Sequence, residues 1–122
     1  MKAIVYGAGA IGGTTGAALA RAGHDVLLVD SYREHVEAIN AHGLTVERDS
    51  TATTTRVAAV MPAELGSELP LVLLAVKSHH TAEALRHVAP RLAPSGTIVS
   101  LQNGLSEEQI AQAVGEIGRA HV

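Results

Sequence analysis

Three glycines near the start of the chain have the spacing of a phosphate-binding loop. Gly7, Gly9 and Gly12 fit the pattern G-x-G-x-x-G. In such a loop the first glycine allows a tight turn, the second lets the backbone approach a pyrophosphate, and the third lets a helix pack closely on a strand. The N-terminus of that helix attracts the anion. We therefore expect the pyrophosphate of a dinucleotide to be bound by Gly7, Ala8, Gly9, Ala10, Ile11 and Gly12.

The alternative is that these glycines serve only a tight turn. The context favours binding, because the loop follows an apolar run, opens a small-residue helix and precedes a second apolar run that ends in an acid. That acid is Asp30, 18 residues after Gly12. Dinucleotide-binding folds place a carboxylate there on the adenosine ribose, which favours NAD. Arg33, three residues on, could instead bind the 2′-phosphate of NADP. A local turn role for Asp30 and a solvated position for Arg33 remain open.

Two further polar residues follow apolar runs. Lys77 comes directly after one run, and Asn103 follows the next in Gln-Asn-Gly. Ligands of open α/β sheets bind at the carboxyl ends of strands. We therefore expect Lys77 to hold a substrate carboxylate or carbonyl, and Asn103 to bridge cofactor and substrate. A surface lysine and a plain Asn-Gly turn are the alternatives.

The seven histidines suggest no metal site. His79 and His80 open a helix beside Lys77, which leaves room for one of them to line the cleft. Adjacent side chains do not share a helix face, so they do not form a ligand pair. We expect the scattered histidines to be solvated, namely His24, His35, His42 and His87.

The elements that must position these residues alternate between strand and helix. Short apolar runs predict buried strands at residues 3–6, 26–29, 71–76 and 97–101. Helical patterns cover residues 10–22, 32–41 and 81–92, and Ser106 caps a last helix. This alternation predicts an α/β fold with a Rossmann-type, doubly wound and mainly parallel sheet.

Other patterns predict local detail. Residues 44–47 and 53–57 are β-prone around a turn at 48–50, which indicates a small antiparallel excursion. A short helical turn is expected at 62–66 and a turn at 94–96. The inner helix faces are expected to carry Val36, Ala38 and Ile39 in one helix, and Ala84, Leu85, Val88 and Leu92 in the other.

Composition limits the class of protein. The chain has 122 residues, 47% of them hydrophobic and 2% aromatic, which fits one domain with an aliphatic core. A net charge of -3 without a basic stripe argues against nucleic-acid binding. The absence of cysteine excludes disulfides and thiolate catalysis. The longest apolar run, residues 71–76, is too short to span a bilayer, so we expect no membrane association and a cytoplasmic location.

Taken together, three motifs resemble the ketopantoate reductase (2-dehydropantoate 2-reductase) family. They are the glycine loop, Ala-Val-Lys-Ser around Lys77, and Leu-Gln-Asn-Gly around Asn103. The resemblance implies NAD(P)H-dependent reduction of 2-dehydropantoate, or a related 2-oxo acid, on the route to pantothenate and coenzyme A. It also implies that Lys77 and Asn103 lie at the nicotinamide and substrate. Members that use NADPH often carry a basic residue close after the second strand. This chain has Asp30 at the end of that strand and Arg33 further on, so NAD and NADP both remain open.

The resemblance also bears on domain organisation. It covers residues 1–115, which we expect to form the NAD(P)-binding domain, and it implies a helical C-terminal substrate domain that this chain lacks. We therefore expect the 122 residues to bind cofactor without turnover. Residues 116–122 are expected to be a non-native tail, because a common sequencing adapter translates to the same seven residues; a natural helix end is the alternative. A homodimer is one assembly open to the full-length protein.

Two other readings remain. One is another two-domain dehydrogenase of similar N-terminal design, such as an opine or glycerol-3-phosphate type. The other is a non-catalytic NAD(P)-binding module, which would need the glycine loop but neither Lys77 nor Asn103. The joint presence of Lys77 and Asn103 favours the ketopantoate reductase type over both.

Overall fold

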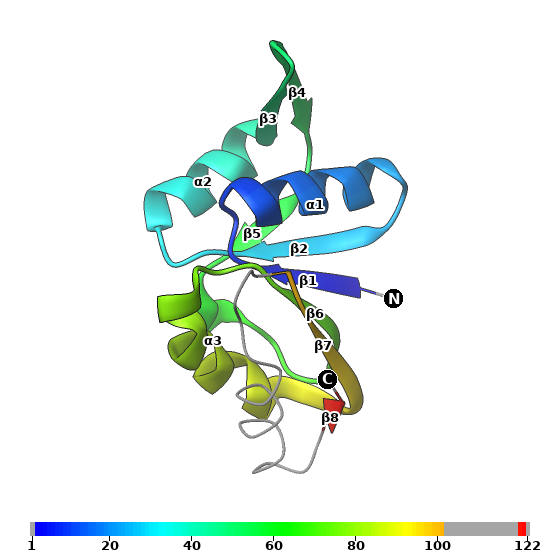
Figure 1. Cartoon of the computed structure of the whole chain (residues 1–122), viewed down its shortest axis with the longest axis vertical. Coiled ribbons are helices and arrows are strands. Elements are labelled where there is room, and N and C mark those ends of the chain that lie inside the picture. The colour runs from blue at the N-terminus through cyan, green and yellow to red at the C-terminus, as the bar shows by residue number, and fades with distance from the viewer. Residues whose placement is uncertain (1, 102–119, 122) are drawn as a thin grey trace.

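A parallel sheet forms the centre of the molecule (Figure 1). The computed structural model describes residues 2–101 and 120–121. Within them six strands lie side by side in the order β5 (Ala58–Val60), β2 (Asp25–Val29), β1 (Lys2–Tyr6), β6 (Leu69–Leu74), β7 (Leu92–Ser100) and β8 (Ala120–His121). Every neighbouring pair is parallel. Counted along the chain this is the order 3-2-1-4-5-6 of a Rossmann sheet, which confirms the predicted fold class.

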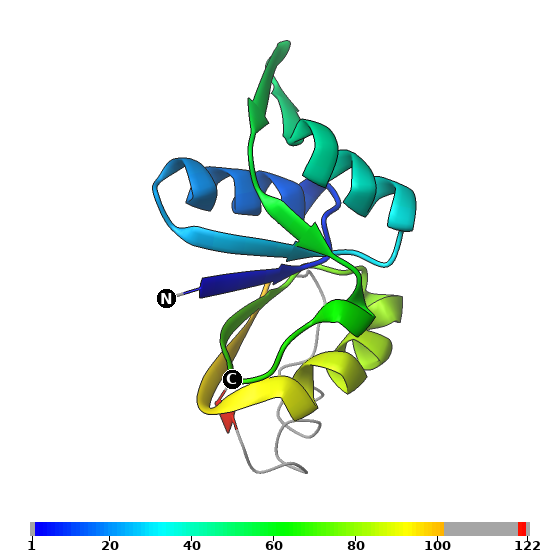
Figure 2. The ribbon, with the colours of Figure 1, turned by 180° about the vertical axis from the view of Figure 1, so that it is seen from behind.

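Helices cover both faces of this sheet. Helices α1 (Ala10–Arg21) and α2 (Arg33–His42) lie on one face, and α3 (Thr81–Val88) lies on the other, as the front and back views agree (Figures 1 and 2). Successive strand residues point to opposite faces. In β1, Val5 therefore packs in the core under α1 and α2, whereas Ile4 packs in the core under α3.

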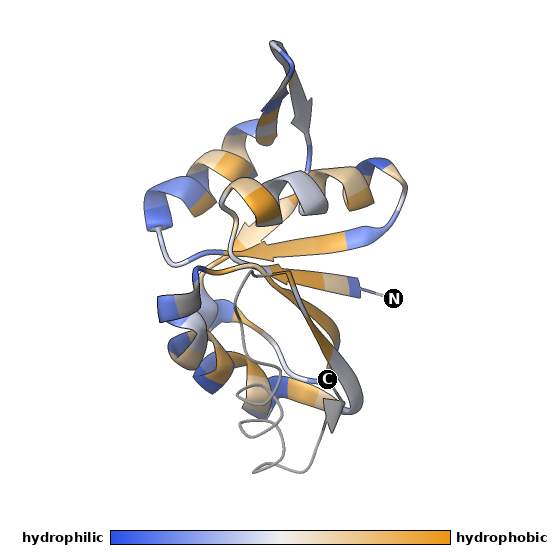
Figure 3. Ribbon diagram, viewed as in Figure 1, coloured by the Kyte–Doolittle hydropathy of each residue, from blue (hydrophilic) through white to orange (hydrophobic). Residues whose placement is uncertain are grey.

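The strands are apolar along most of their length, as expected for a sheet buried on both faces (Figure 3). The buried side chains are almost all aliphatic, with Ile4, Leu28, Val72 and Leu74 fully enclosed. None of the helices in residues 2–101 has the length and apolar composition that crossing a bilayer takes.

A hairpin projects beyond the end of α2 (Figure 1). Strands β3 (Leu44–Arg48) and β4 (Thr51–Thr55) pair antiparallel, which confirms the predicted excursion. Asp49 and Ser50 form its two-residue turn with φ of 49° and 66°, the backbone that such tight hairpins require. Short 3-10 turns complete the described chain at Pro62–Glu64, Ser78–His80 and Ala89–Arg91.

The structure differs from the sequence-based expectations in three strands. Strand β5 was not predicted, because three residues are too few to show a period. Strand β6 ends at Leu74, two residues early, since the backbone at Ala75 turns into close contact with the glycine loop. The turn expected at 94–96 lies inside β7, at an irregularity where pairing jumps from Leu69 to Leu71.

Two helical expectations also need correction. The helix expected over 81–92 ends at Val88 and continues as a 3-10 turn, because Pro90 lacks the N–H that a continuing helix needs. Ala38 was expected on the inner face of α2 but is exposed, since the buried stripe follows Val36 and Ile39 at a spacing of three. The helix expected from Ser106 lies outside the described residues.

Candidate nucleotide-binding site

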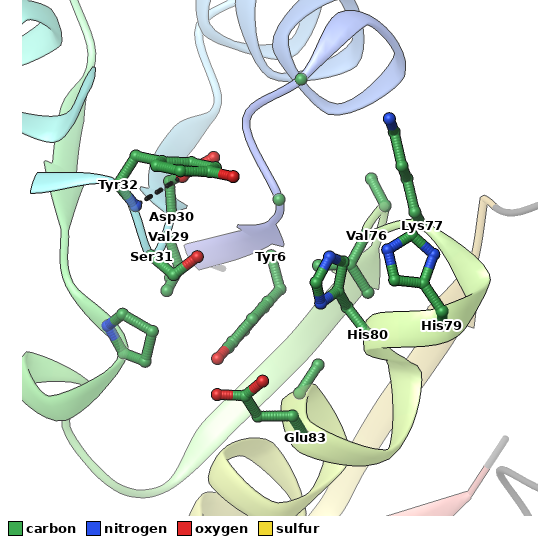
Figure 4. A pocket seen from close by; sticks show the side chains of 15 residues that line it. Tyr6, Val29, Asp30, Ser31, Tyr32, Val76, Lys77, His79, His80 and Glu83 are labelled. Carbon is green, nitrogen blue, oxygen red and sulfur yellow. Dashed lines mark hydrogen bonds between the residues drawn. The ribbon is translucent and has the colours of Figure 1, made fainter. Parts of the chain in front are cut away.

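A cavity of about 360 Å³ opens at the carboxyl ends of β1, β2 and β6 (Figure 4). Strand order reverses between β1 and β6, because the chain runs outward from β1 in one direction and then returns to start β6 on its other side. Open α/β sheets bind ligands at this switch point. The volume lies within the range of ligand pockets.

The glycine loop forms one wall of the cavity, and its glycines are required for different reasons. Gly7 has a φ of +106°, and a Cβ there would lie 2.9 Å from the Ala75 carbonyl carbon. A Cβ on Gly12 would overlap the carbonyl oxygen of Gly7, so α1 packs against the loop only without a side chain. Both positions match the turn and packing roles expected of them.

Gly9 is different, because no heavy atom lies within 4 Å of the position its Cβ would take. Gly9 also lines the cavity and directly precedes the first turn of α1. The first N–H groups of an α-helix have no partners within the helix, and they carry its positive dipole end. The open space beside Gly9 therefore fits an anionic group such as a pyrophosphate.

Asp30 connects the end of β2 to this loop. Its Oδ2 accepts a hydrogen bond from the Ala8 N–H at 3.0 Å, and its Oδ1 accepts one from the Tyr32 N–H at 2.9 Å. The carboxylate also lines the cavity (Figure 4). The Asp30 side chain therefore makes a local turn contact with Tyr32 and also lines the cavity.

His35 also holds the loop, which corrects the expectation that it is solvated. Its Nε2 lies 2.9 Å from the carbonyl oxygen of Ala8, and the side chain is partly buried. His87 is partly buried as well, whereas His24 and His42 are exposed as expected. Sequence reasoning missed His35 because its partner is 27 positions away and carries no side-chain signal.

Lys77 stands at the cavity beside two histidines, as expected for a residue that follows β6. Its side chain is exposed and lines the cavity together with His79 and His80 (Figure 4). The two imidazole centroids are 4.0 Å apart with planes tilted by 46°. Among the described residues no group of three His, Asp or Glu side chains is arranged to hold a metal ion.

Tyr6 and Glu83 also line the cavity, Tyr6 as a buried residue and Glu83 as an exposed one, and sequence reasoning missed both. The Tyr6 hydroxyl and the Glu83 carboxylate face one another (Figure 4). Burial, and then the negative charge of Glu83, raise the pKa of Tyr6 to about 12, so this phenol stays neutral at ordinary pH. Tyr6 could have been found from its place directly before the glycine loop, at the carboxyl end of the first strand.

The structure brings together Gly7, Gly9, Asp30 and Lys77 around one cavity. The remaining loop residues lie beside it: Ala8 is buried behind the loop, and Ala10, Ile11 and Gly12 form the first turn of α1. Arg33 is exposed at the start of α2 and is outside the cavity lining as described. Asn103 lies outside the described residues.

The parallel strand order, the glycine loop before α1 and the cavity at the switch point define a Rossmann domain of the dinucleotide-binding type. The family model described as "Ketopantoate reductase PanE/ApbA" matches residues 3–122. The chain therefore belongs to the ketopantoate reductase family.

Curated relatives agree with this assignment. The chain is 39% identical over 105 residues to the 2-dehydropantoate 2-reductase of Mesorhizobium japonicum, covering 86% of this chain and 32% of that protein. It is 36% identical over 120 residues to the Pyrococcus horikoshii protein of the same name, covering 94% and 37%. The chain thus spans about a third of the length of the curated relatives it matches.

Solved structures show the same fold. A D-mandelate dehydrogenase with NADH and anilino(oxo)acetate superposes with a TM-score of 0.86 at 27% identity, covering 98% of this chain and 39% of that one. A PanE/ApbA family ketopantoate reductase from Ralstonia eutropha JMP134 gives 0.79 at 38% identity, with the same two coverages.

Proposed function

We propose that this chain is the nucleotide-binding part of an NAD(P)H-dependent reductase that converts 2-dehydropantoate, or a related 2-oxo acid, to its 2-hydroxy acid on the route to pantothenate. The observation that carries the proposal is the open position beside Gly9, at the helix N-terminus and the switch point together. The names of the relatives support the substrate class, and the NADH in the D-mandelate dehydrogenase structure supports a nicotinamide cofactor.

Each site residue then has a distinct task. The loop from Gly7 to Gly12 holds the pyrophosphate, and Asp30 accepts hydrogen bonds from the adenosine ribose hydroxyls. A bound nicotinamide dinucleotide supplies the hydride. Lys77 offers a positive charge to the substrate carboxylate or carbonyl, and Asn103 bridges cofactor and substrate. A proton donor for the resulting alkoxide belongs to a further domain, because Lys77 holds the substrate as a charge rather than as an acid.

The cofactor we propose is NAD(H) rather than NADP(H). The Asp30 carboxylate lines the cavity at the end of β2, where a 2′-phosphate would meet like charge. Arg33, the residue that could offset this repulsion, is exposed and is not among the described residues of the cavity wall.

The wider organisation is also a proposal. Residues 1–115 form the NAD(P)-binding domain. Residues 116–122 are a non-native tail, in which case the two-residue pairing of β8 with β7 does not belong to the native sheet. The full-length protein acts in the cytoplasm, where a homodimer is one assembly open to it.

The activity is tested by joining residues 1–114 to the C-terminal domain of a curated relative and following oxidation of NADH and NADPH with 2-dehydropantoate. We expect substrate-dependent oxidation in the joined protein and none in the 122-residue chain. Lys77→Ala and Asn103→Ala should each lower the rate of the joined protein sharply. Oxidation that no 2-oxo acid stimulates in the joined protein, although it binds cofactor, would contradict the proposed activity.

A further inference from the structure

One face of the sheet is left without a helix at β6 and β7. Helix α1 packs on β1 and β2, and α2 packs on β5, so both lie over the same half of the sheet (Figures 1 and 2). Helix α3 lies over the opposite face, beside β6 and β7. Within residues 2–101, the α1 side of β6 and β7 therefore has no helix over it.

The burial of one row of side chains shows where the cover ends. Val5 in β1, Leu73 in β6 and Val99 in β7 are successive partners across the sheet, on the α1 side. Val5 is fully buried, Leu73 is half-buried, and Val99 is 40% exposed. On the other side of β7, Ile98 is 1% exposed in the core under α3. Burial is thus lost on one side of β7 only.

The composition of these two strands is typical of strands covered on both sides. Parallel strands buried on both faces are near-continuous apolar runs, whereas a strand with one face in water alternates with polar residues. Strand β6 carries no charged side chain, and β7 places Val99 where alternation would place a polar residue. The neighbouring pair in the same register is Leu71 and Thr97. We call Leu71, Leu73, Thr97 and Val99 the uncovered face; none of them is charged.

The curated relatives have enough additional chain to cover this face. The match spans 32% of the Mesorhizobium japonicum protein and 37% of the Pyrococcus horikoshii protein, so about two thirds of each lies outside it. A domain joined covalently to β7 reaches the uncovered face at a much higher effective concentration than a second copy does. An uncharged aliphatic face gains free energy when it is buried against another apolar surface.

We infer that the C-terminal part of the full-length protein docks an apolar surface on the uncovered face of β6 and β7 and buries Val99. The inference rests on the wider organisation proposed above, in which a further domain follows residues 1–115, and not on the reaction. It gives the two domains a contact on a face of the sheet, separate from the cavity at the carboxyl ends of the strands.

The experiment uses a single thiol on the uncovered face. The chain contains no cysteine, so Val99→Cys introduces only one. We compare the rate of maleimide labelling in the 122-residue chain and in residues 1–114 joined to a cysteine-free C-terminal domain of a curated relative. Labelling should be about tenfold slower or more in the joined protein, because the thiol reacts only when the docked surface opens. Thr53→Cys, on the exposed strand β4, is the matched control and should label equally fast in both.

A second variant tests the same contact without a thiol. Val99→Lys places a charge where the docked surface is apolar, whereas in the 122-residue chain the ammonium can remain in water. We expect this substitution to lower the Tm of the joined protein more than that of the 122-residue chain.

Two results would overturn the inference. Equal labelling of Val99→Cys in the 122-residue chain and in the joined protein would show that the face stays uncovered. Protection that is already present in the 122-residue chain, and that rises with protein concentration, would assign the face to a second copy. These outcomes are separate from the proposed activity. A joined protein that reduces a 2-oxo acid while Val99→Cys labels freely contradicts this inference alone, whereas a protected thiol in an inactive joined protein supports the docking and contradicts the activity.

Discussion

His35 Nε2 lies 2.9 Å from the carbonyl oxygen of Ala8, so a side chain of α2 holds the middle of the glycine loop. The same peptide unit is held at its other end, because the Ala8 N–H donates to Asp30 Oδ2 at 3.0 Å. The loop is therefore fixed in its shape by two residues that follow β2. A loop fixed before binding loses less conformational entropy when a ligand arrives.

Removing the imidazole should weaken cofactor binding without removing the pocket. We expect His35→Leu to lower the affinity for NADH by about three- to tenfold, since one hydrogen bond contributes about 0.5–1.5 kcal/mol. His35→Gln should recover part of the loss, because its amide can donate to the Ala8 carbonyl. Calorimetry measures both, with exposed His42→Leu as control. Full affinity in His35→Leu would show that the loop does not depend on this contact.

Two alanine substitutions in the glycine loop should affect different properties, one the stability of the fold and the other the affinity for NADH. Gly12→Ala places a Cβ on the Gly7 carbonyl oxygen, so we expect it to lower the free energy of unfolding by about 1–3 kcal/mol or more. Gly9→Ala places its Cβ in open space and should leave stability within about 0.5 kcal/mol while weakening NADH binding. Chemical denaturation and calorimetry measure the two effects. Comparable destabilisation by both substitutions would contradict the assigned packing.

The glycine loop and the mainly parallel sheet could be predicted from the sequence because they rest on local patterns. An apolar run ended by glycine indicates a strand, and four such runs in alternation with helices predict a parallel sheet. Asp30 and Lys77 were found for the same reason, since each directly follows an apolar run in the sequence. Side chains that reach the site across the fold were not found. His35 and Glu83 belong to helix faces whose neighbours only the packed structure reveals.

Strand β5 could not be predicted from the sequence for a different reason. Ala58–Val60 is too short for a period, and its place beside β2 depends on a pairing over about thirty residues. The contacts of Asn40 help to hold it: its side chain donates to the Ala59 carbonyl and accepts from the Ala59 N–H, both at 2.9 Å. A pair of hydrogen bonds from one asparagine side chain to a distant backbone unit has no signature in the sequence.

The charge on Asp30 should set the cofactor preference. We expect the unmodified chain to bind NADH more tightly than NADPH, and Asp30→Asn to shift the ratio toward NADPH, because the amide removes the like charge near a 2′-phosphate. Asparagine has one acceptor oxygen, so it keeps only one of the two hydrogen bonds that Asp30 accepts from the Ala8 and Tyr32 N–H groups, and the affinity for both cofactors should fall. The ratio of the two affinities is therefore the readout. Calorimetry with both cofactors is the test. Tighter NADPH binding that is lost in Arg33→Ala would mean that Arg33 decides the preference instead.

The raised pKa of Tyr6 should make the free energy of unfolding fall in alkaline solution. Its pKa is raised to about 12 in the folded protein, above the ordinary value of 10.0, so the folded state holds a proton that the unfolded state releases. The contribution of the neutral Tyr6 phenol to the free energy of unfolding is complete below about pH 10 and declines as pH rises toward about pH 12. Tyr6→Phe should flatten this decline in urea denaturation, whereas Tyr32→Phe, at a side chain that is 74% exposed, should not. Equal slopes in both variants would contradict the assignment to Tyr6.

The central claim, that a dinucleotide binds through the glycine loop, is tested most directly by calorimetry of NADH with the 122-residue chain and its Gly9→Val variant. Gly66→Val is the control, since the Cβ position of Gly66 is equally open but lies outside the cavity lining. The account predicts saturable binding by the unmodified chain and by Gly66→Val, and none by Gly9→Val at the same concentrations. Unchanged affinity in a folded Gly9→Val variant would contradict it.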